Sequence, residues 1–225
     1  MKLDKHVILN GIIHCKTGLR IGGPKDDIEI GGMDNPIIRN PLTGLPYIPG
    51  SSLKGRIRSL LELKYSEMSQ RTGHPCQCGD ASCKVCKIFG PHKNTTHQLG
   101  PTRIIVRDAD LTETSKEILK DTLEEKGINY AEIKAENWVD RKTGVAGEGG
   151  LRTQERVPAG TEFDFEIVIR IFENDDEKEI IDFIAEGMSM LEKEYLGSSG
   201  SRGYGKIKFM DLSINGEPFQ LPGEK

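Results

Sequence analysis

One stretch of the chain, Thr161–Phe172, constrains the fold more than any other. Apolar side chains recur at every second position of this stretch, as Phe163, Phe165, Ile167, Ile169 and Ile171. Because alternate side chains of a β-strand point to opposite faces of a sheet, these five share one face. The pattern therefore predicts a long strand with one apolar face.

Further strands and two long helices are predicted around this strand. The other strand-like segments are His6–Cys15, Arg103–Ala109 and Lys206–Ile214. The first helix begins near Ser51 or Ser52, either of which can cap it, and runs to about Met68. The second helix spans Asp175–Leu196. This order is close to β-α-β-β-α-β, which predicts an α+β fold of the modified ferredoxin-like (RRM-like) type.

The length of 225 residues suits one domain with insertions. Three segments do not fit the predicted core. Residues 16–49 are rich in Gly and Pro, residues 70–100 carry the cysteines, and residues 137–160 hold five glycines and resemble a projecting hairpin. We therefore predict a single domain over residues 1–225 with these three insertions.

No apolar run reaches the roughly 18 residues that a membrane helix needs, and the N-terminus has no signal-peptide pattern. We expect a cytoplasmic protein without a membrane partner. The net charge of −4 does not exclude nucleic acid, because the charge is unevenly distributed. Residues 50–107 hold ten Lys or Arg against three Asp or Glu, whereas residues 173–194 hold nine acids and two lysines.

Four of the five cysteines lie close together between Cys76 and Cys86. Three thiolates come from Cys78, Cys83 and Cys86, and either Cys76 or His74 can supply a fourth ligand. Soft thiolates with or without one imidazole suit tetrahedral Zn²⁺, and closed four-ligand zinc sites are structural. The spacing favours a zinc-stapled loop over four free surface thiols.

The glycine-rich run Gly197–Gly205 lies between the second helix and the last strand. Glycines allow close approach of a ligand to the backbone amides, and phosphate is the natural partner of such amides. A flexible connector would have much the same composition. Arg202 and Tyr204 favour RNA, because a connector needs neither a guanidinium nor a ring. The predicted RNA contacts of this run are Gly200, Ser201, Arg202, Gly203 and Tyr204.

Four segments together resemble the RAMP superfamily of CRISPR-associated proteins: Thr17–Gly23, Gly32–Ile38, Leu45–Arg58 and Gly197–Lys206. Within it, the chain resembles the repeated backbone subunits of type III-A (Csm) effector complexes, with the type III-B (Cmr) equivalent as the alternative. The resemblance covers nearly the whole chain. It implies an RRM-like domain that binds guide RNA, assembles head to tail with copies of itself, and associates with other Csm-complex subunits.

The resemblance also implies roles for particular residues. Asp34, in the 16–49 lid, would cleave target RNA with Mg²⁺ or Mn²⁺, opposite kinks introduced by the 137–160 thumb. A carboxylate on a glycine-rich loop can hold a divalent ion beside a phosphate, although Asp34 before Asn-Pro would otherwise be read as a turn former. The remaining residues implied in guide binding are Arg20, Ser51, Ser52, Lys54, Arg56 and Arg58.

A non-catalytic guide-RNA scaffold is the competing hypothesis, since every feature except Asp34 is compatible with it. A stand-alone guide-processing nuclease fits less well, because no histidine-centred site is evident.

Overall fold

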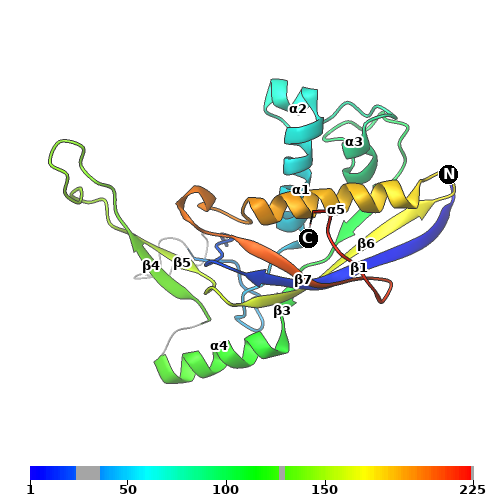
Figure 1. Cartoon of the computed structure of the whole chain (residues 1–225). Helices are drawn as coiled ribbons and strands as arrows, with labels where there is room; N and C mark the ends of the chain where they lie inside the picture. Colours follow the sequence, from blue (N-terminus) through cyan, green and yellow to red (C-terminus); the bar gives the residue numbers. More distant parts are fainter. Residues whose placement is uncertain (24–35, 127–129, 224–225) are drawn as a thin grey trace.

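The main sheet is antiparallel and has helices packed against it (Figure 1). The computed structural model describes residues 1–23, 36–126 and 130–223. Along the sheet the strands follow the order β2, β6, β1, β7, β8, and the short strand β3 also pairs with β6. Their bounds are Leu3–Cys15 for β1, Ile104–Val106 for β2, Asp110–Leu111 for β3, Glu162–Phe172 for β6, Ile207–Ile214 for β7 and Glu217–Pro218 for β8.

The pairing of β1 with β6 forms the centre of the sheet. Its register runs from Lys5 opposite Ile171 to His14 opposite Glu162, with an irregularity near Leu3. The alternating apolar residues of β6 are all buried, which confirms the predicted strand. Their partners in the core are the buried apolar residues of β1, which are Val7, Leu9, Ile13 and Cys15.

Helix α1 spans Gly50–Tyr65 and begins differently from the prediction. Its cap is Pro49, and neither Ser51 nor Ser52 makes a side-chain capping hydrogen bond. The backbone N–H of Gly50 instead donates to Asp108 Oδ1 at 2.7 Å. The capping expectation was wrong because a carboxylate distant in sequence already satisfies this N–H and lies favourably at the positive end of the helix.

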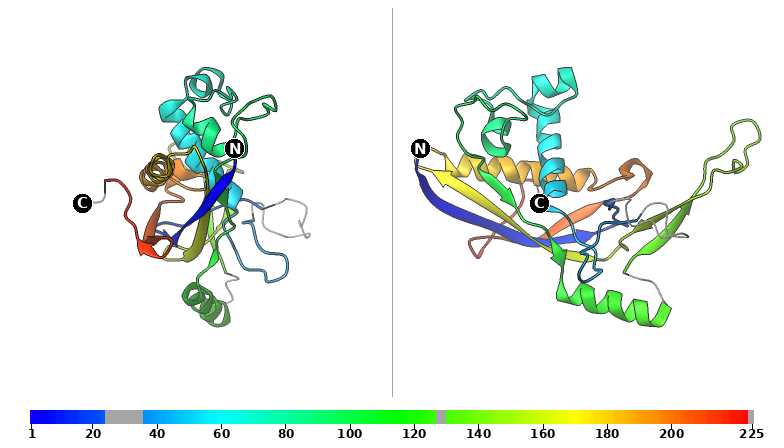
Figure 2. Two further views of the ribbon diagram at one scale, coloured as in Figure 1. Left: turned by 90° about the vertical axis from the view of Figure 1, so that its right-hand side faces the viewer. Right: turned by 180° about the vertical axis from the view of Figure 1, so that it is seen from behind.

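The remaining helices and a separate hairpin complete the chain. Helix α1 stops before the predicted end, and a short α2, Glu67–Thr72, follows it. Helix α5 spans Glu177–Lys193. The other elements are α3 (Lys84–Phe89), α4 (Glu113–Lys126), β4 (Glu132–Glu136), β5 (Arg152–Arg156) and the 3-10 turn η1 (Gly200–Arg202). Strands β4 and β5 form a two-stranded sheet that projects from the body of the protein (Figure 2).

A buried ion pair joins the start of α5 to the edge of the sheet. Arg103 Nε donates to Asp175 Oδ2 at 2.9 Å, and both side chains are 3% exposed. Lys87 of α3 lies 3.1 Å from the same carboxylate. Burial alone would raise the pKa of Asp175, but hydrogen bonds from Arg103 and Lys87 hold it below its ordinary value. This carboxylate therefore ties the cysteine-bearing loop, the sheet edge and α5 together.

Among the helices in the described residues, none combines the length and the apolar composition that crossing a membrane requires.

Close packing of α1 against α5 depends on Gly187. A Cβ added at this glycine would lie 2.7 Å from Ile57 and 2.8 Å from Leu61. We expect Gly187→Leu to destabilise the fold by about 1–3 kcal/mol through overpacking, measured by chemical denaturation. The matched control is Gly55→Ala in α1, where a Cβ meets nothing within 4 Å; it should stabilise by about 0.5–1 kcal/mol. Equal stabilities of the two variants would contradict this account of the packing.

Candidate nucleic-acid interface and metal centre

The glycine-rich run lies beside the segment that follows β1, although the two are far apart in sequence. The backbone N–H of Gly205 donates to the carbonyl of Gly18 at 3.0 Å, and that of Ser198 donates to the carbonyl of Arg20 at 2.9 Å. This approach requires glycine at position 197, which has φ 78° and where a Cβ would stand 2.3 Å from the Arg20 carbonyl oxygen. Two of the four motif segments thus form a single surface.

The tip of this surface is a tight turn. Ser199 adopts a left-handed conformation with φ 63° before η1, and Gly203 does so with φ 86° after it. Ser201, Arg202 and Gly203 are exposed. Arg20 approaches from the side, where its Nη1 donates to Ser198 Oγ at 2.9 Å. The backbone N–H groups of Arg202 and Gly203 donate to the carbonyls of Ser199 and Gly200. The exposed side chains of Ser201 and Arg202, with Arg20 beside them, are therefore the groups of this turn that suit a phosphate chain.

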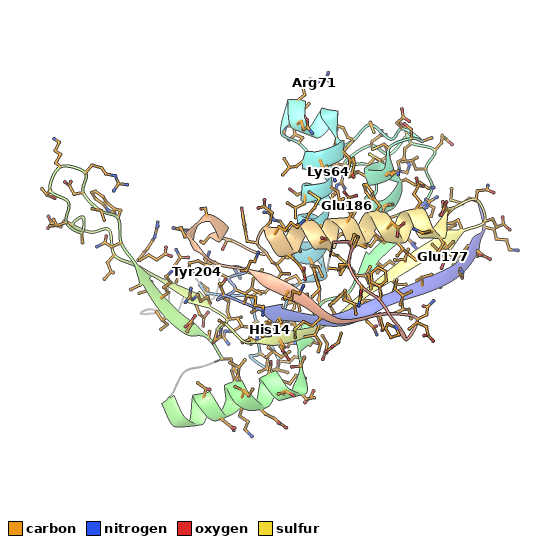
Figure 3. The ribbon with its side chains drawn as sticks, in the orientation of Figure 1. His14, Lys64, Arg71, Glu177, Glu186 and Tyr204 are labelled. Atoms are coloured by element: carbon orange, nitrogen blue, oxygen red, sulfur yellow. The ribbon has the colours of Figure 1, made fainter. Side chains whose placement is uncertain are left out.

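Tyr204 does not belong to the exposed part of the turn. Its side chain is 1% exposed, and its hydroxyl donates to Glu136 Oε1 of β4 at 2.8 Å. The ammonium of Lys134 lies 4.5 Å from the ring centroid and the guanidinium of Arg156 lies 4.9 Å from it. Figure 3 shows the ring between the glycine-rich turn and the projecting hairpin. The expectation of an RNA-facing ring is therefore not met, because the ring is buried between these elements.

The basic residues of α1 serve different parts of the structure. Arg56 lies 4.2 Å from the centroid of the Tyr195 ring, and its Nε donates to the Tyr195 carbonyl at 2.9 Å. The same ring packs directly under Gly200, where an added Cβ would stand 1.9 Å away. Arg56 therefore supports the glycine-rich turn indirectly, by holding the Tyr195 ring against Gly200.

Arg58 contacts the cysteine-bearing loop instead. Its Nε donates to Glu62 at 2.8 Å, and its Nη2 donates to the carbonyl of Cys76 at 2.9 Å. Lys54 is half-buried near Arg58, and burial, then Arg58 and Arg170, lower its pKa. Loss of solvation and nearby cations both disfavour the charged form of Lys54, and an anion bound beside it would offset this. Arg56 and Arg58 thus contact different parts of the structure, and Lys54 lies near Arg58.

Asp34 lies outside the described residues, whereas the chain on either side of residues 24–35 is described. An isolated bridge joins Gly22 to Ile37, and the N–H of Ile38 donates to the carbonyl of Ile21 at 2.8 Å. Glu155 of β5 accepts from the N–H of Ile37 at 2.8 Å and pairs with Arg39. The two ends of the segment that holds Asp34 therefore meet beside the projecting hairpin.

Sequence reasoning missed Glu136 and Glu155. Both are carboxylates of a charged hairpin without an apolar pattern, so nothing in the sequence distinguishes them from solvent-facing acids. Only the fold brings Glu136 to the glycine-rich turn and Glu155 to the segment after residue 35.

The four clustered cysteines come together in space. Their Sγ atoms all lie within 4.8 Å of one another, and four of the separations are 3.5, 3.6, 3.6 and 3.9 Å. In a tetrahedral site with Zn–S distances of about 2.3 Å, neighbouring sulfurs are about 3.8 Å apart. The thiols therefore fit a four-coordinate metal ion. His74 is exposed and is not part of this group.

Local structure around Cys83 favours the thiolate form of its side chain. It caps α3, and its Sγ accepts from the N–H of Cys86 at 3.4 Å. The Cys86 thiol contributes most to lowering the pKa of Cys83 to about 5, and the backbone N–H adds to this, against the opposing effect of burial. A thiolate is the form that binds metal, so the fold favours the ligating state at this position.

Comparison with known proteins places the chain in a family. The sequence profile of the RAMP superfamily matches residues 12–208. The chain therefore belongs to the RAMP superfamily.

Individual members of known sequence or structure are also similar to this chain. The protein named CRISPR system Cms endoribonuclease Csm3 of Methanocaldococcus jannaschii is 48% identical over 97% of this chain and 84% of its own length. Its namesake from Methanothermobacter thermautotrophicus is 45% identical over 98% of this chain and 90% of its own length. A solved Csm3-Csm4 subcomplex of the type III-A CRISPR-Cas interference complex contains a chain 38% identical to this one. The two superpose with a TM-score of 0.60 over 95% of this chain and 80% of that chain.

A metal ion held by the four cysteines should stabilise the chain. An ion present at 100 times its Kd stabilises by about 2.7 kcal/mol, or roughly 5–11 °C in melting temperature for this size. We expect a chelator or Cys76→Ala to lower the melting temperature by such an amount and to release one metal ion per chain in elemental analysis. His74→Ala is the control and should retain the ion. Metal loss in His74→Ala but not in Cys76→Ala would contradict the four-cysteine site.

Proposed function

We propose that this chain is the guide-RNA-binding backbone subunit of a type III-A CRISPR effector complex and an endoribonuclease that cuts paired target RNA at regular intervals. The names of its relatives and the subcomplex that its structure resembles support this proposal. One structural observation supports this proposal most strongly. The glycine-rich turn, the segment after β1 and the two ends of the Asp34 segment are joined by hydrogen bonds or bridges into one region beside the hairpin.

Guide RNA would be held through its phosphates, because the exposed turn offers serine hydroxyls and arginine side chains that suit phosphate oxygens. Gly200, Ser201, Arg202 and Gly203 form the turn that would contact the RNA, and Arg20 flanks it. Ser51, Ser52 and Lys54 extend the contact along α1. Arg56 acts by supporting the turn, and Arg58 by joining α1 to the cysteine loop.

Cleavage is assigned to Asp34 with Mg²⁺ or Mn²⁺. When bound, the divalent ion supplies charge stabilisation at the phosphate and helps orient the attacking 2′-hydroxyl. Asp34 holds the ion, and Glu155 fixes the backbone three residues further on at Ile37. A single carboxylate is a sparse site, so RNA oxygens would have to supply further ligands to the ion. Cytoplasmic complexes of several copies, arranged head to tail with other Csm subunits, would present one such site per copy.

The fold proposal is a modified ferredoxin-like domain over residues 1–225. The strand order β7, β1, β6, β2 and the helices α1 and α5 support it, since this is the arrangement of a β-α-β-β-α-β unit. Residues 16–49 form the lid, residues 137–160 the thumb, and residues 70–100 a loop stapled by structural Zn²⁺. The sulfur separations fit tetrahedral Zn²⁺.

Asp34→Ala tests the catalytic assignment. The variant should assemble and bind complementary RNA, yet cut it roughly 100-fold or more slowly, because several kcal/mol of charge stabilisation are lost. The readout is the ladder of regularly spaced fragments formed with Mg²⁺. Asp121→Ala, an exposed carboxylate on α4, is the control and should leave the ladder intact. An unchanged ladder in Asp34→Ala would favour the non-catalytic scaffold.

A further inference from the structure

A single carboxylate joins the projecting hairpin to the glycine-rich turn. Glu136 accepts a hydrogen bond from the Tyr204 hydroxyl at 2.8 Å and pairs with Arg202 Nη1 of the turn at 3.2 Å. From the hairpin itself, Lys134 Nζ and Arg152 Nε each lie 3.6 Å from this carboxylate. The Glu136 side chain is only 10% exposed. The hairpin and the glycine-rich turn, which are separate in sequence, are therefore joined by the largely buried carboxylate of Glu136.

The protonation states suit this arrangement. Burial would raise the pKa of Glu136, but the Tyr204 hydroxyl and then Arg202, Lys134 and Arg152 lower it below its ordinary value. Burial, and then Glu136, raise the pKa of Tyr204. Glu136 is therefore an acceptor and Tyr204 a donor at neutral pH, and hydrogen bonds to an ionised acceptor are stronger than neutral ones.

The place of Glu136 along the hairpin matters as much as its partners. Glu136 opposite Arg152 is the final pair of the β4–β5 ladder, and residues 137–151 project beyond it. The hairpin is a two-stranded sheet of its own, and such a sheet is marginally stable without outside contacts. At its other end Val157 bridges to Leu19, and Arg156 packs against Gly18. Glu136 is the contact nearest to the point where the projection begins.

We propose that Glu136 is a positioning residue that sets the direction of the projection, residues 137–151, relative to the glycine-rich turn. This inference rests on the proposed function: RNA bound on the turn and the projection keep a constant spacing through Glu136. Tyr204 and Arg202 fix that spacing on the side of the turn, because both bind Glu136. Regular cutting then depends on a residue that itself does not touch the scissile bond.

Trp138 allows the anchoring to be measured directly. It is the sole tryptophan of the chain, follows Glu136 by two residues and is 51% exposed. Time-resolved fluorescence anisotropy of the full-length chain should show a larger fast component in Glu136→Ala and in Tyr204→Phe than in the wild type. Glu148→Ala, another acid of the projection but exposed, should match the wild type. Unchanged anisotropy in both Glu136→Ala and Tyr204→Phe would overturn the proposal.

Cleavage by assembled complexes tests the functional consequence. Loss of a negative charge should leave guide affinity unchanged or raise it, since phosphate repulsion falls. With saturating target, Glu136→Ala should cut at least about 10-fold more slowly or lose the regular spacing, because small misplacements of reacting groups have large effects. Tyr204→Phe removes only one hydroxyl and should show the same change more weakly, which keeps the test valid if Glu136→Ala folds poorly.

The two measurements separate the possible failures. If the anisotropy shows a more mobile Trp138 but the cuts keep their rate and positions, the positioning role is overturned. A lower melting temperature with the same cut positions and rate per complex would reduce Glu136 to a stabilising residue and also overturn it. Absence of cuts in the wild-type complex would contradict the proposed function instead, while anisotropy would still decide whether Glu136 anchors the projection.

Discussion

The antiparallel pairing of β1 with β6 is the interaction on which the rest of this structure depends. Neighbouring strands run in opposite directions, so the end of β1 lies beside the starts of β6 and β7, with His14 opposite Glu162 and Cys15 opposite Ile207. Three segments therefore meet at the same ends of these strands. They are the chain that leaves β1, the hairpin that precedes β6 and the glycine-rich run that precedes β7. The candidate RNA surface is a consequence of strand direction as much as of residue type.

Buried and half-buried ion pairs then join these segments to one another. Asp175 ties the cysteine loop to the sheet, and Glu136 and Glu155 tie the hairpin to the turn and to the chain after residue 35. In each case a carboxylate meets at least one arginine and accepts additional hydrogen bonds, as a desolvated charge requires. The net charge of −4 does not reveal this internal use of acids.

The long, strongly periodic elements could be predicted from sequence, because one face of each packs on the core and the period of apolar residues records that face. This holds for β1, β6, β7 and α5, with bounds that differ by a few residues. Shorter elements were less predictable. The expected strand Arg103–Ala109 forms only as Ile104–Val106, with Ala109 in an isolated bridge to Ile48. Arg103 lies just before this short strand, and its side chain pairs with Asp175.

Sequence by itself determined the family, the glycine-rich run and the cysteine cluster, because these depend on residue types at short spacings along the chain. Asp34 was assigned through family resemblance alone. Tertiary structure decided which residues share a surface: it buried Tyr204, brought Asp108 to the first N–H of α1 and gathered four thiols without His74. Contacts such as Glu136 with Tyr204 join residues 68 positions apart. No local pattern encodes such pairs, since only the folded path of the backbone brings them within hydrogen-bonding distance.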